Sequence, residues 1–157
     1  MENSSIYAFL HENYEGIKQK AGERGFKKYL TEKIRAQRLD AYLARKRQLV
    51  KSISELIFAE DIGKEDIGLL NDEHTRIMIT SMPYGATNEI PFYYSIWLRY
   101  GHEHGIAEAS TREKAKSLPG YFLINANMIK LTEKGLKLAS LIKNIEKAKE
   151  RGFWGVF

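Results

Sequence analysis

Residues 128–143 read MIKLTEKGLKLASLIK and contain an abrupt change of pattern. The first four residues predict a short strand, and Thr132, which follows them, is a residue type that caps helix N-termini. Beyond it, apolar residues recur at three- and four-residue spacing, as they do along the buried face of an amphipathic helix. The members of this stripe are Leu138, Leu141, Ile142 and Ile145. The stretch therefore predicts a strand that leads directly into a capped helix.

The residues before this stretch predict the rest of a hairpin and a short helix. Residues 121–124, YFLI, form the expected partner strand, and the tight turn at residues 125–127 contains two Asn, which tolerate left-handed backbone angles. Ser110 and Glu113 have the spacing of a capping box, which predicts a short helix over residues 111–118. A Pro-Gly pair directly after that helix ends it.

Two further helices are predicted upstream. Asp72 caps the first, and Glu73 is favourable in its first turn. After a turn at residues 83–87, Asn88 caps the second helix, and Pro91 is tolerated in its first turn. The buried stripe of this second helix consists of Phe92, Ile96, Trp97 and Tyr100. The expected order is therefore helix, helix, short helix, two-stranded hairpin and helix.

This order is the layout of a winged helix-turn-helix, and residues 128–142 resemble a junction in winged-helix regulators of the MarR and PadR kind. In those regulators the second wing strand leads through a Leu-Thr-x-x-Gly turn into the next helix. The matching residues here are Leu131, Thr132, Glu133, Lys134 and Gly135. The resemblance covers the C-terminal half of the chain and implies a winged-helix-like α+β module. A hairpin and capped helix in another α+β fold would give the same pattern.

The resemblance also implies residue roles. Residues 110–118 would be the recognition helix in the major groove, and Arg112, Lys114 and Lys116 would face the groove or the phosphates. Arginine suits bidentate contact with guanine, whereas lysine serves as a point charge for phosphate. The sequence departs from the regulators' pattern in the shortness of this helix and at the wing tip, residues 125–127, which has no Arg or Lys.

The net charge of the chain is +5, and its charges are segregated along the sequence. Residues 1–17 carry −3, residues 18–51 carry +9, residues 52–113 carry −7 and residues 114–157 carry +6. Two basic blocks around an acidic middle are expected if two surfaces face a polyanion. The pattern favours a nucleic-acid partner, and with the winged-helix layout that partner is duplex DNA.

No Gly or Pro interrupts residues 26–59, whose second half has an apolar stripe that Lys46 interrupts. The stripe comprises Leu39, Tyr42, Leu43, Leu49, Val50, Ile53, Leu56 and Ile57. A single helix of this length would reach roughly 45–50 Å, so it either breaks or serves as a spine, which favours a homodimer. The basic residues expected to contact phosphates are Arg35, Arg38, Arg45, Lys46 and Arg47. The alternative is that they form the solvated face of a dimerising helix.

The end of the chain contains Phe153, Trp154 and Phe157, large apolar side chains that need to be covered. They either fold back on the domain or bind another protein, because Trp and Phe dominate interface hot spots.

Few residues in the sequence indicate a catalytic or metal-binding site. The chain has no cysteine, which excludes disulfides, thiol catalysis and Cys-based zinc sites. His102 and His104 would point in nearly opposite directions on a helix, so we assign them to a hydrated helix end and expect no metal site. No pairing of a nucleophile with a base stands out, and we expect neither enzymatic activity nor a cofactor.

The sequence as a whole predicts a mainly α protein in two parts. Residues 1–60 form a helical region with a long basic amphipathic helix, and residues 61–157 form a winged-helix-like domain with an aromatic tail. The N-terminus lacks a signal-peptide core, and the uncharged stretch at residues 77–88 is too short to span a bilayer, so we expect a cytoplasmic protein with no membrane partner.

The expected function is that of a homodimeric DNA-binding transcription regulator. The alternative is a non-enzymatic interaction protein of a phage or mobile element, which binds a host protein or a protein–nucleic acid complex.

Overall fold

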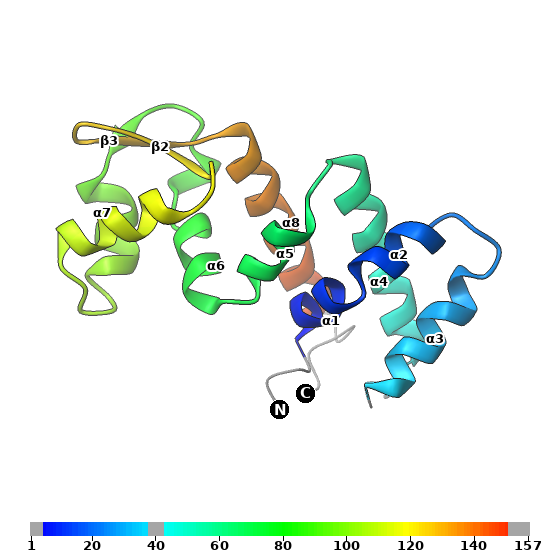
Figure 1. Ribbon diagram of the computed structural model, residues 1–157. Coiled ribbons are helices and arrows are strands. Elements are labelled where there is room, and N and C mark those ends of the chain that lie inside the picture. Colours follow the sequence, from blue (N-terminus) through cyan, green and yellow to red (C-terminus); the bar gives the residue numbers. More distant parts are fainter. Residues whose placement is uncertain (1–4, 38–42, 151–157) are drawn as a thin grey trace. The chain divides into compact units, whose positions relative to one another are not determined.

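A computed structural model describes residues 5–37 and 43–150 of the chain (Figure 1). They divide into two compact units. The helical unit comprises the described residues up to Asp72 together with those from Lys143 onward, and the sheet unit comprises Glu73–Ile142. The division therefore falls after Asp72 rather than near residue 60, and the end of the last helix belongs to the first unit. The fold is mainly helical with one small antiparallel sheet.

The elements of the helical unit are α1 (Ile6–Glu12), α2 (Tyr14–Lys20), α3 (Phe26–Ala36), α4 (Leu43–Ala59), α5 (Lys64–Leu70) and the end of α8 (Glu133–Glu150). The first two helices are separated at Asn13, which is the C-cap of α1 and the N-cap of α2. The Asn13 side-chain amide donates to the Phe9 carbonyl at 2.9 Å, which ends α1 there. Asparagine side chains compete in this way with the backbone hydrogen bonds of a helix.

The uninterrupted stretch from residue 26 to residue 59 is two helices rather than one spine. Helix α3 ends at Ala36, with Gln37 as its C-cap, and α4 begins at Leu43; residues 38–42, including Arg38, Leu39 and Tyr42, lie outside the described residues. The Gln37 side chain donates to the Glu12 carboxylate at 2.7 Å, so the end of α3 is tied to α1. The absence of Gly and Pro permitted a long helix but did not enforce one.

Helix α5 has two acidic residues, Glu65 and Asp66, in its first turn. The Asp66 carboxylate accepts from the Gly63 backbone N–H at 3.3 Å, which stabilises the first turn of α5. At Gly68, an added Cβ would come within 2.9 Å of the His11 ring, so glycine allows α5 to lie close against α1. The Tyr14 hydroxyl donates to the Ile62 carbonyl at 2.7 Å and closes the loop before α5 onto α2.

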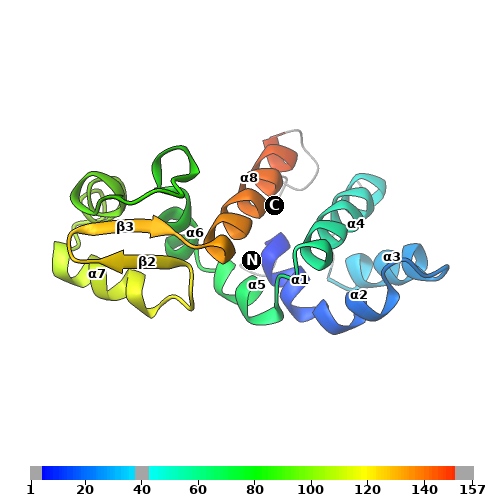
Figure 2. The same ribbon diagram turned by 90° about the horizontal axis from the view of Figure 1, so that it is seen from above.

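The elements of the sheet unit are α6 (Glu73–Thr80), the 3-10 helix η2 (Pro83–Gly85), β1 (Ile90–Pro91), the π-helix η3 (Tyr93–Gly101), α7 (Glu108–Ser117), β2 (Phe122–Asn125), β3 (Met128–Leu131) and the start of α8. Its strands form an antiparallel sheet in the order β1-β3-β2. Figure 2 shows β2 and β3 side by side in this sheet. Ile129 of β3 faces Ile90 on one side and Ile124 on the other.

The third strand corrects the prediction of a two-stranded hairpin. Residues 90 and 91 were expected in the first turn of a helix capped by Asn88, but they pair with Ile129 and Met128 instead. Proline is acceptable in this position because β1 is an edge strand. The helix begins only at Tyr93, and it contains a kink at Ser95, where φ is −120° and ψ is −106°. The Ser95 hydroxyl lies within hydrogen-bonding distance of the Pro91 and Phe92 carbonyls, at 3.1 and 3.0 Å.

Helix α7 also differs from its predicted bounds. It begins at Glu108 with Ala107 as N-cap, so Ser110 lies inside the helix and the predicted capping box is wrong. The Thr111 backbone N–H donates to the Ala107 carbonyl at 2.9 Å, so the hydrogen bonds of the helix begin before Ser110, and the buried Thr111 hydroxyl donates to the same carbonyl. The helix has 10 residues, nearly three turns, and is longer than the sequence indicated.

The hairpin and its connection to α8 follow the prediction closely. The turn residue with a left-handed backbone is Ala126, at φ +54°, rather than either neighbouring asparagine. The Thr132 hydroxyl accepts from the Gly135 N–H at 3.1 Å, so Thr132 caps α8 as predicted. The four residues of the predicted α8 stripe are buried: Leu138, Leu141, Ile142 and Ile145. Close packing explains the glycine at position 135, because a Cβ on Gly135 would collide with the Tyr121 carbonyl oxygen.

Candidate nucleic-acid interface

Helix α7 has one buried face and one open face. Thr111 and Ala115 are buried against the rest of the sheet unit, and an added Cβ at Gly101 of η3 would collide with the Thr111 hydroxyl. This close approach fixes α7 against η3. The opposite face is exposed along the helix, and its polar members are Ser110, Glu113, Lys114, Lys116 and Ser117. The arrangement presents a rigidly held helix whose outer face is open to a ligand.

Arg112, the residue predicted to read bases, lies on the border of this exposed face and makes three intramolecular contacts. Its Nη1 donates to the Ala126 carbonyl at 2.6 Å, and its guanidinium lies 4.5 Å from the centre of the Phe92 ring. Its Nη2 is 3.8 Å from the Glu108 carboxylate, and 21% of the side chain remains exposed. These contacts join α7 to the hairpin turn and to the start of η3. Contact with guanine would require Arg112 to leave them.

The two lysines of α7 are exposed, as their predicted role requires. The Lys116 ammonium lies 4.0 Å from the Glu113 carboxylate in a pair that is open to solvent. Such surface pairs contribute at most about 1 kcal/mol, so a phosphate can replace the carboxylate at little cost. The exposed face of α7 is therefore mildly cationic, with Glu113 between Lys114 and Lys116 in the helical order.

The hairpin adds a cation that the sequence analysis missed. Lys130 of β3 lies opposite Leu123 of β2, so both side chains are on the same face of the sheet. Leu123 is 49% exposed, whereas the neighbours of Lys130 in β3, Ile129 and Leu131, are buried on the other face. The position of Lys130 between Ile129 and Leu131 in a predicted strand could have revealed this cation, because successive side chains point to opposite faces. The tip itself is uncharged, because only Ala126 and Asn127 separate the paired ends of the strands.

The basic residues of the helical unit do not form one helical face. Arg35 is exposed on α3 and Arg45 is exposed on α4, while Arg47 is half-buried and donates to the Thr31 hydroxyl at 2.9 Å. Lys46 is fully buried and cannot lie on a phosphate-binding surface, which corrects that part of the prediction. The reason is helical geometry, since Lys46 precedes Leu49 and Val50 by three and four residues and falls on the same buried stripe.

The remaining residues that the sequence singled out are the aromatic tail, Arg38 and two histidines. The aromatic tail, with Phe153, Trp154 and Phe157, lies outside the described residues, as does Arg38. His102 and His104 are exposed at the end of η3, and His104 Nδ1 donates to the Tyr100 carbonyl at 2.8 Å. Within residues 5–37 and 43–150, no cluster of His, Asp or Glu has the arrangement of a metal site.

Comparison with known proteins identifies no relative, since no family model, no curated protein and no solved structure matches this chain. Among the described helices, none combines the length and the apolar character that crossing a membrane demands.

Proposed function

We propose that the sheet unit is a winged helix that binds duplex DNA, and that the protein is a transcription regulator similar in this part to the MarR and PadR kind. The observation that carries the proposal is the element order of helix, strand, helix, helix, strand, strand, with the sheet order β1-β3-β2. In this layout α6 and η3 support α7 as the recognition helix, and β2 and β3 form the wing. The short strand β1 joins the wing to the segment before η3 and gives the module its third strand.

In this proposal the side chains of α7 and of the wing have separate tasks. Lys114, Lys116 and Lys130 neutralise phosphates, which supplies affinity that depends on salt but not on sequence. Ser110 and Glu113 lie nearly one turn apart on the exposed face, and they can hydrogen-bond to base edges in the major groove. Arg112 acts as a positioning residue, because its contacts fix the wing relative to α7. A major-groove helix needs such support to keep one register on the duplex.

We further propose that the regulator acts as a homodimer. One α7 per chain offers a single recognition helix with few cations, and helix-turn-helix proteins gain affinity by binding two half-sites about one helical turn apart. Light scattering of the intact protein gives the mass directly. A monomeric mass in the presence and absence of duplex DNA contradicts this part of the proposal and leaves DNA binding by a single module.

The test of DNA binding is a salt series with the double variant Lys114→Gln/Lys116→Gln. Fluorescence anisotropy with random and genomic duplexes should show binding that weakens steeply with salt in the unmodified protein. Loss of two phosphate contacts should lower the slope of log affinity against log salt by about 2 and weaken binding by about tenfold or more. Lys143→Gln/Lys147→Gln, which removes the same charge from an exposed part of α8 in the helical unit, is the control. Equal losses in the two variants would contradict the assignment of α7.

A second candidate function, protein binding, is favoured by exposed aromatic residues on η3. Tyr93 and Tyr94 are 47% and 64% exposed, and Leu98 is 39% exposed. The Tyr93 ring stacks on Trp97 with 4.8 Å between ring centres, which gives the surface a rigid aromatic base. Aromatic residues of this kind are frequent anchors of protein interfaces. If Tyr94→Ser abolishes capture of a specific protein partner while DNA binding is unchanged, the chain has an interaction role of its own.

A further inference from the structure

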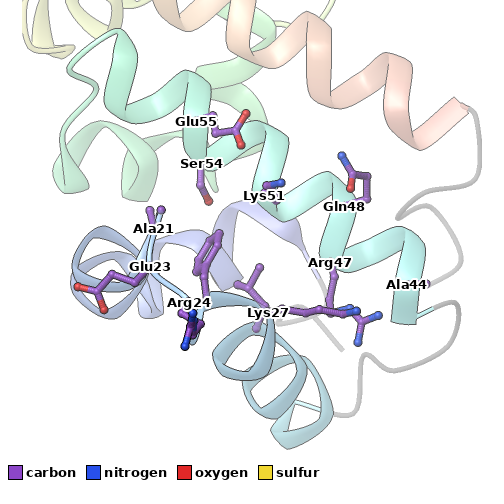
Figure 3. A pocket seen from close by; sticks show the side chains of 13 residues that line it. Ala21, Glu23, Arg24, Lys27, Ala44, Arg47, Gln48, Lys51, Ser54 and Glu55 are labelled. Atoms are coloured by element: carbon purple, nitrogen blue, oxygen red, sulfur yellow. The ribbon is translucent and has the colours of Figure 1, made fainter.

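The helical unit contains a groove of about 540 Å³ between two walls (Figure 3). One wall is α4, which carries Arg47, Lys51 and Glu55, and the other is the α2–α3 turn with the first turn of α3, which carries Glu23, Arg24 and Lys27. These six charged side chains line the groove together with smaller and apolar residues. None of the residues that line it belongs to the sheet unit.

The balance of charge in this groove favours an anion. Four cationic side chains and two acidic ones line it, so the local field is positive. Arg24, Lys27 and Lys51 are exposed, whereas Arg47 is half-buried and is positioned by its hydrogen bond to the Thr31 hydroxyl. Because like charges that line one groove repel each other, a bound anion would stabilise the arrangement. A fixed arginine is the residue best suited to a bidentate contact with phosphate.

The backbone of the α2–α3 turn is left uncovered at two glycines, which lie on the turn's side of the groove. Gly22 and Gly25 line or flank it, and an added Cβ at either glycine would meet nothing within 4 Å. Gly25 is the N-cap of α3, which has no side-chain cap and no acidic residue in its first turn. The N–H groups of a first helical turn favour negative charge, so they add to the attraction of the side chains.

The size and the acidic residues of the groove indicate a small ligand rather than a polymer. The volume is within the range of small-molecule sites, roughly 300–1,000 Å³. Glu23 and Glu55 would repel a continuous phosphate backbone, but they can accept hydrogen bonds from the hydroxyl groups of a small molecule. The buried Phe26 lines the groove as well and supplies an apolar surface.

We propose that this groove binds a small organic phosphate, with Arg24, Lys27, Arg47 and Lys51 around the phosphate and Glu23 and Glu55 toward the uncharged part of the ligand. The site does not depend on the proposed DNA binding, since its residues all belong to the helical unit. In a regulator, such a ligand would be an effector.

The experiment is isothermal titration calorimetry of the intact protein with inorganic pyrophosphate as the probe. The double variant Lys27→Gln/Lys51→Gln should weaken pyrophosphate binding by about tenfold or more, as expected when two charge-assisted contacts are lost. The matched control is Lys18→Gln/Lys64→Gln, which removes the same charge from exposed positions of the helical unit outside the groove. This control should bind within about twofold of the unmodified protein. Circular dichroism establishes that both variants are folded.

A second measurement locates the probe. Pyrophosphate should shift the backbone amide NMR signals of Gly22, Gly25 and Lys27 before those of the sheet unit. Equal weakening in the two double variants would overturn the proposal, and so would shifts confined to the sheet unit. The same holds for no heat at about 10 mM pyrophosphate, where a site with a Kd near 1 mM would be mostly filled. Binding of random duplex DNA that Lys27→Gln/Lys51→Gln weakens, without pyrophosphate binding, would assign the groove to nucleic acid and would equally overturn it.

Discussion

The α2–α3 turn of the helical unit and the β3–α8 connection of the sheet unit use glycine in opposite ways. A Cβ at Gly22 or Gly25 would meet nothing within 4 Å, whereas a Cβ at Gly135 would collide with the Tyr121 carbonyl. In the first region the missing side chain leaves the backbone open to a ligand. In the second it lets two backbone segments touch, so that the hairpin and the start of α8 are held together.

The cationic side chains of the two units also differ, in whether they contact their own unit or remain exposed. Arg112 of the sheet unit contacts a carbonyl, an aromatic ring and a carboxylate of its own unit. Lys27 and Lys51 of the helical unit are exposed around a groove. Substitutions in the sheet-unit connection should therefore change the free energy of unfolding, and substitutions around the groove should change binding. The following predictions test this distinction, and the stability of each unit is followed by its own NMR signals, because two compact units need not unfold in one transition.

The largest effect is expected from Gly135→Ala. The added methyl group would meet the Tyr121 carbonyl and the Leu131 side chain, and neither the backbone nor the packed leucine can move away easily. Overpacking of this kind should lower the free energy of unfolding of the sheet unit by about 3 kcal/mol. Gly25→Ala is the control, because it adds the same group in open space at a φ of −84° and should change stability by less than about 1 kcal/mol. Urea unfolding measures both, and equal effects would remove the distinction between the two regions.

The next largest effect is expected from Arg112→Leu. The variant loses the hydrogen bond to the Ala126 carbonyl and the contact with the Phe92 ring. Together these should lower the free energy of unfolding of the sheet unit by about 2 kcal/mol. Lys116→Gln on the same helix should change it by less than about 0.5 kcal/mol, since its pair with Glu113 is open to solvent. If Arg112→Leu leaves stability unchanged but reduces discrimination among DNA sites, Arg112 is a base-reading residue after all.

Local patterns in the sequence correctly predicted the features that depend only on residues close together in the chain. The α8 stripe, the Thr132 cap and the hairpin β2–β3 were each correct because they are determined within a few residues. Strand β1 was missed because its partner, Ile129, lies far along the chain from Ile90. Two residues alone carry no periodicity, and the proline favoured the wrong interpretation as a helix start.

The sequence predicted less of the candidate sites, because they depend on contacts between residues far apart in the chain. Basic segments were visible in the sequence, but the exposure of each cation depends on packing. Lys46 is buried because it continues the α4 stripe, and Arg112 turns to the hairpin because the chain returns there after the Pro-Gly turn. The groove of the helical unit was not predicted, because it forms between α4 and the turn on the far side of α3.

A moderate effect is expected from Tyr14→Phe in the helical unit. The variant loses the hydrogen bond to the Ile62 carbonyl, which should cost about 1 kcal/mol at neutral pH. Burial, and then the nearby carboxylates of Glu15, Asp61 and Asp66, raise the pKa of Tyr14 above its ordinary value of 10.0.

The raised pKa gives this prediction a pH dependence. Above pH 10, the unfolded chain loses the tyrosine proton while the folded chain keeps it, so stability should fall as the pH rises through this range. Tyr14→Phe should make that fall shallower, and urea unfolding at neutral pH and above pH 10 measures it. An unchanged slope would mean that Tyr14 ionises in the folded protein as readily as in the unfolded chain.

The smallest effect, and a stabilising one, is expected at the hairpin tip. Ala126 has a φ of +54°, a left-handed conformation that costs a non-glycine residue about 1–2 kcal/mol. Ala126→Gly removes that cost but increases the freedom of the unfolded chain, which offsets about 0.5–1 kcal/mol. The net gain for the sheet unit should be about 0.5 kcal/mol. Because Arg112 donates to the carbonyl of this same residue, the gain should be larger in unmodified protein than in Arg112→Leu, where the turn is no longer held in place. Identical gains in both backgrounds would show that Arg112 does not hold the turn in its strained conformation.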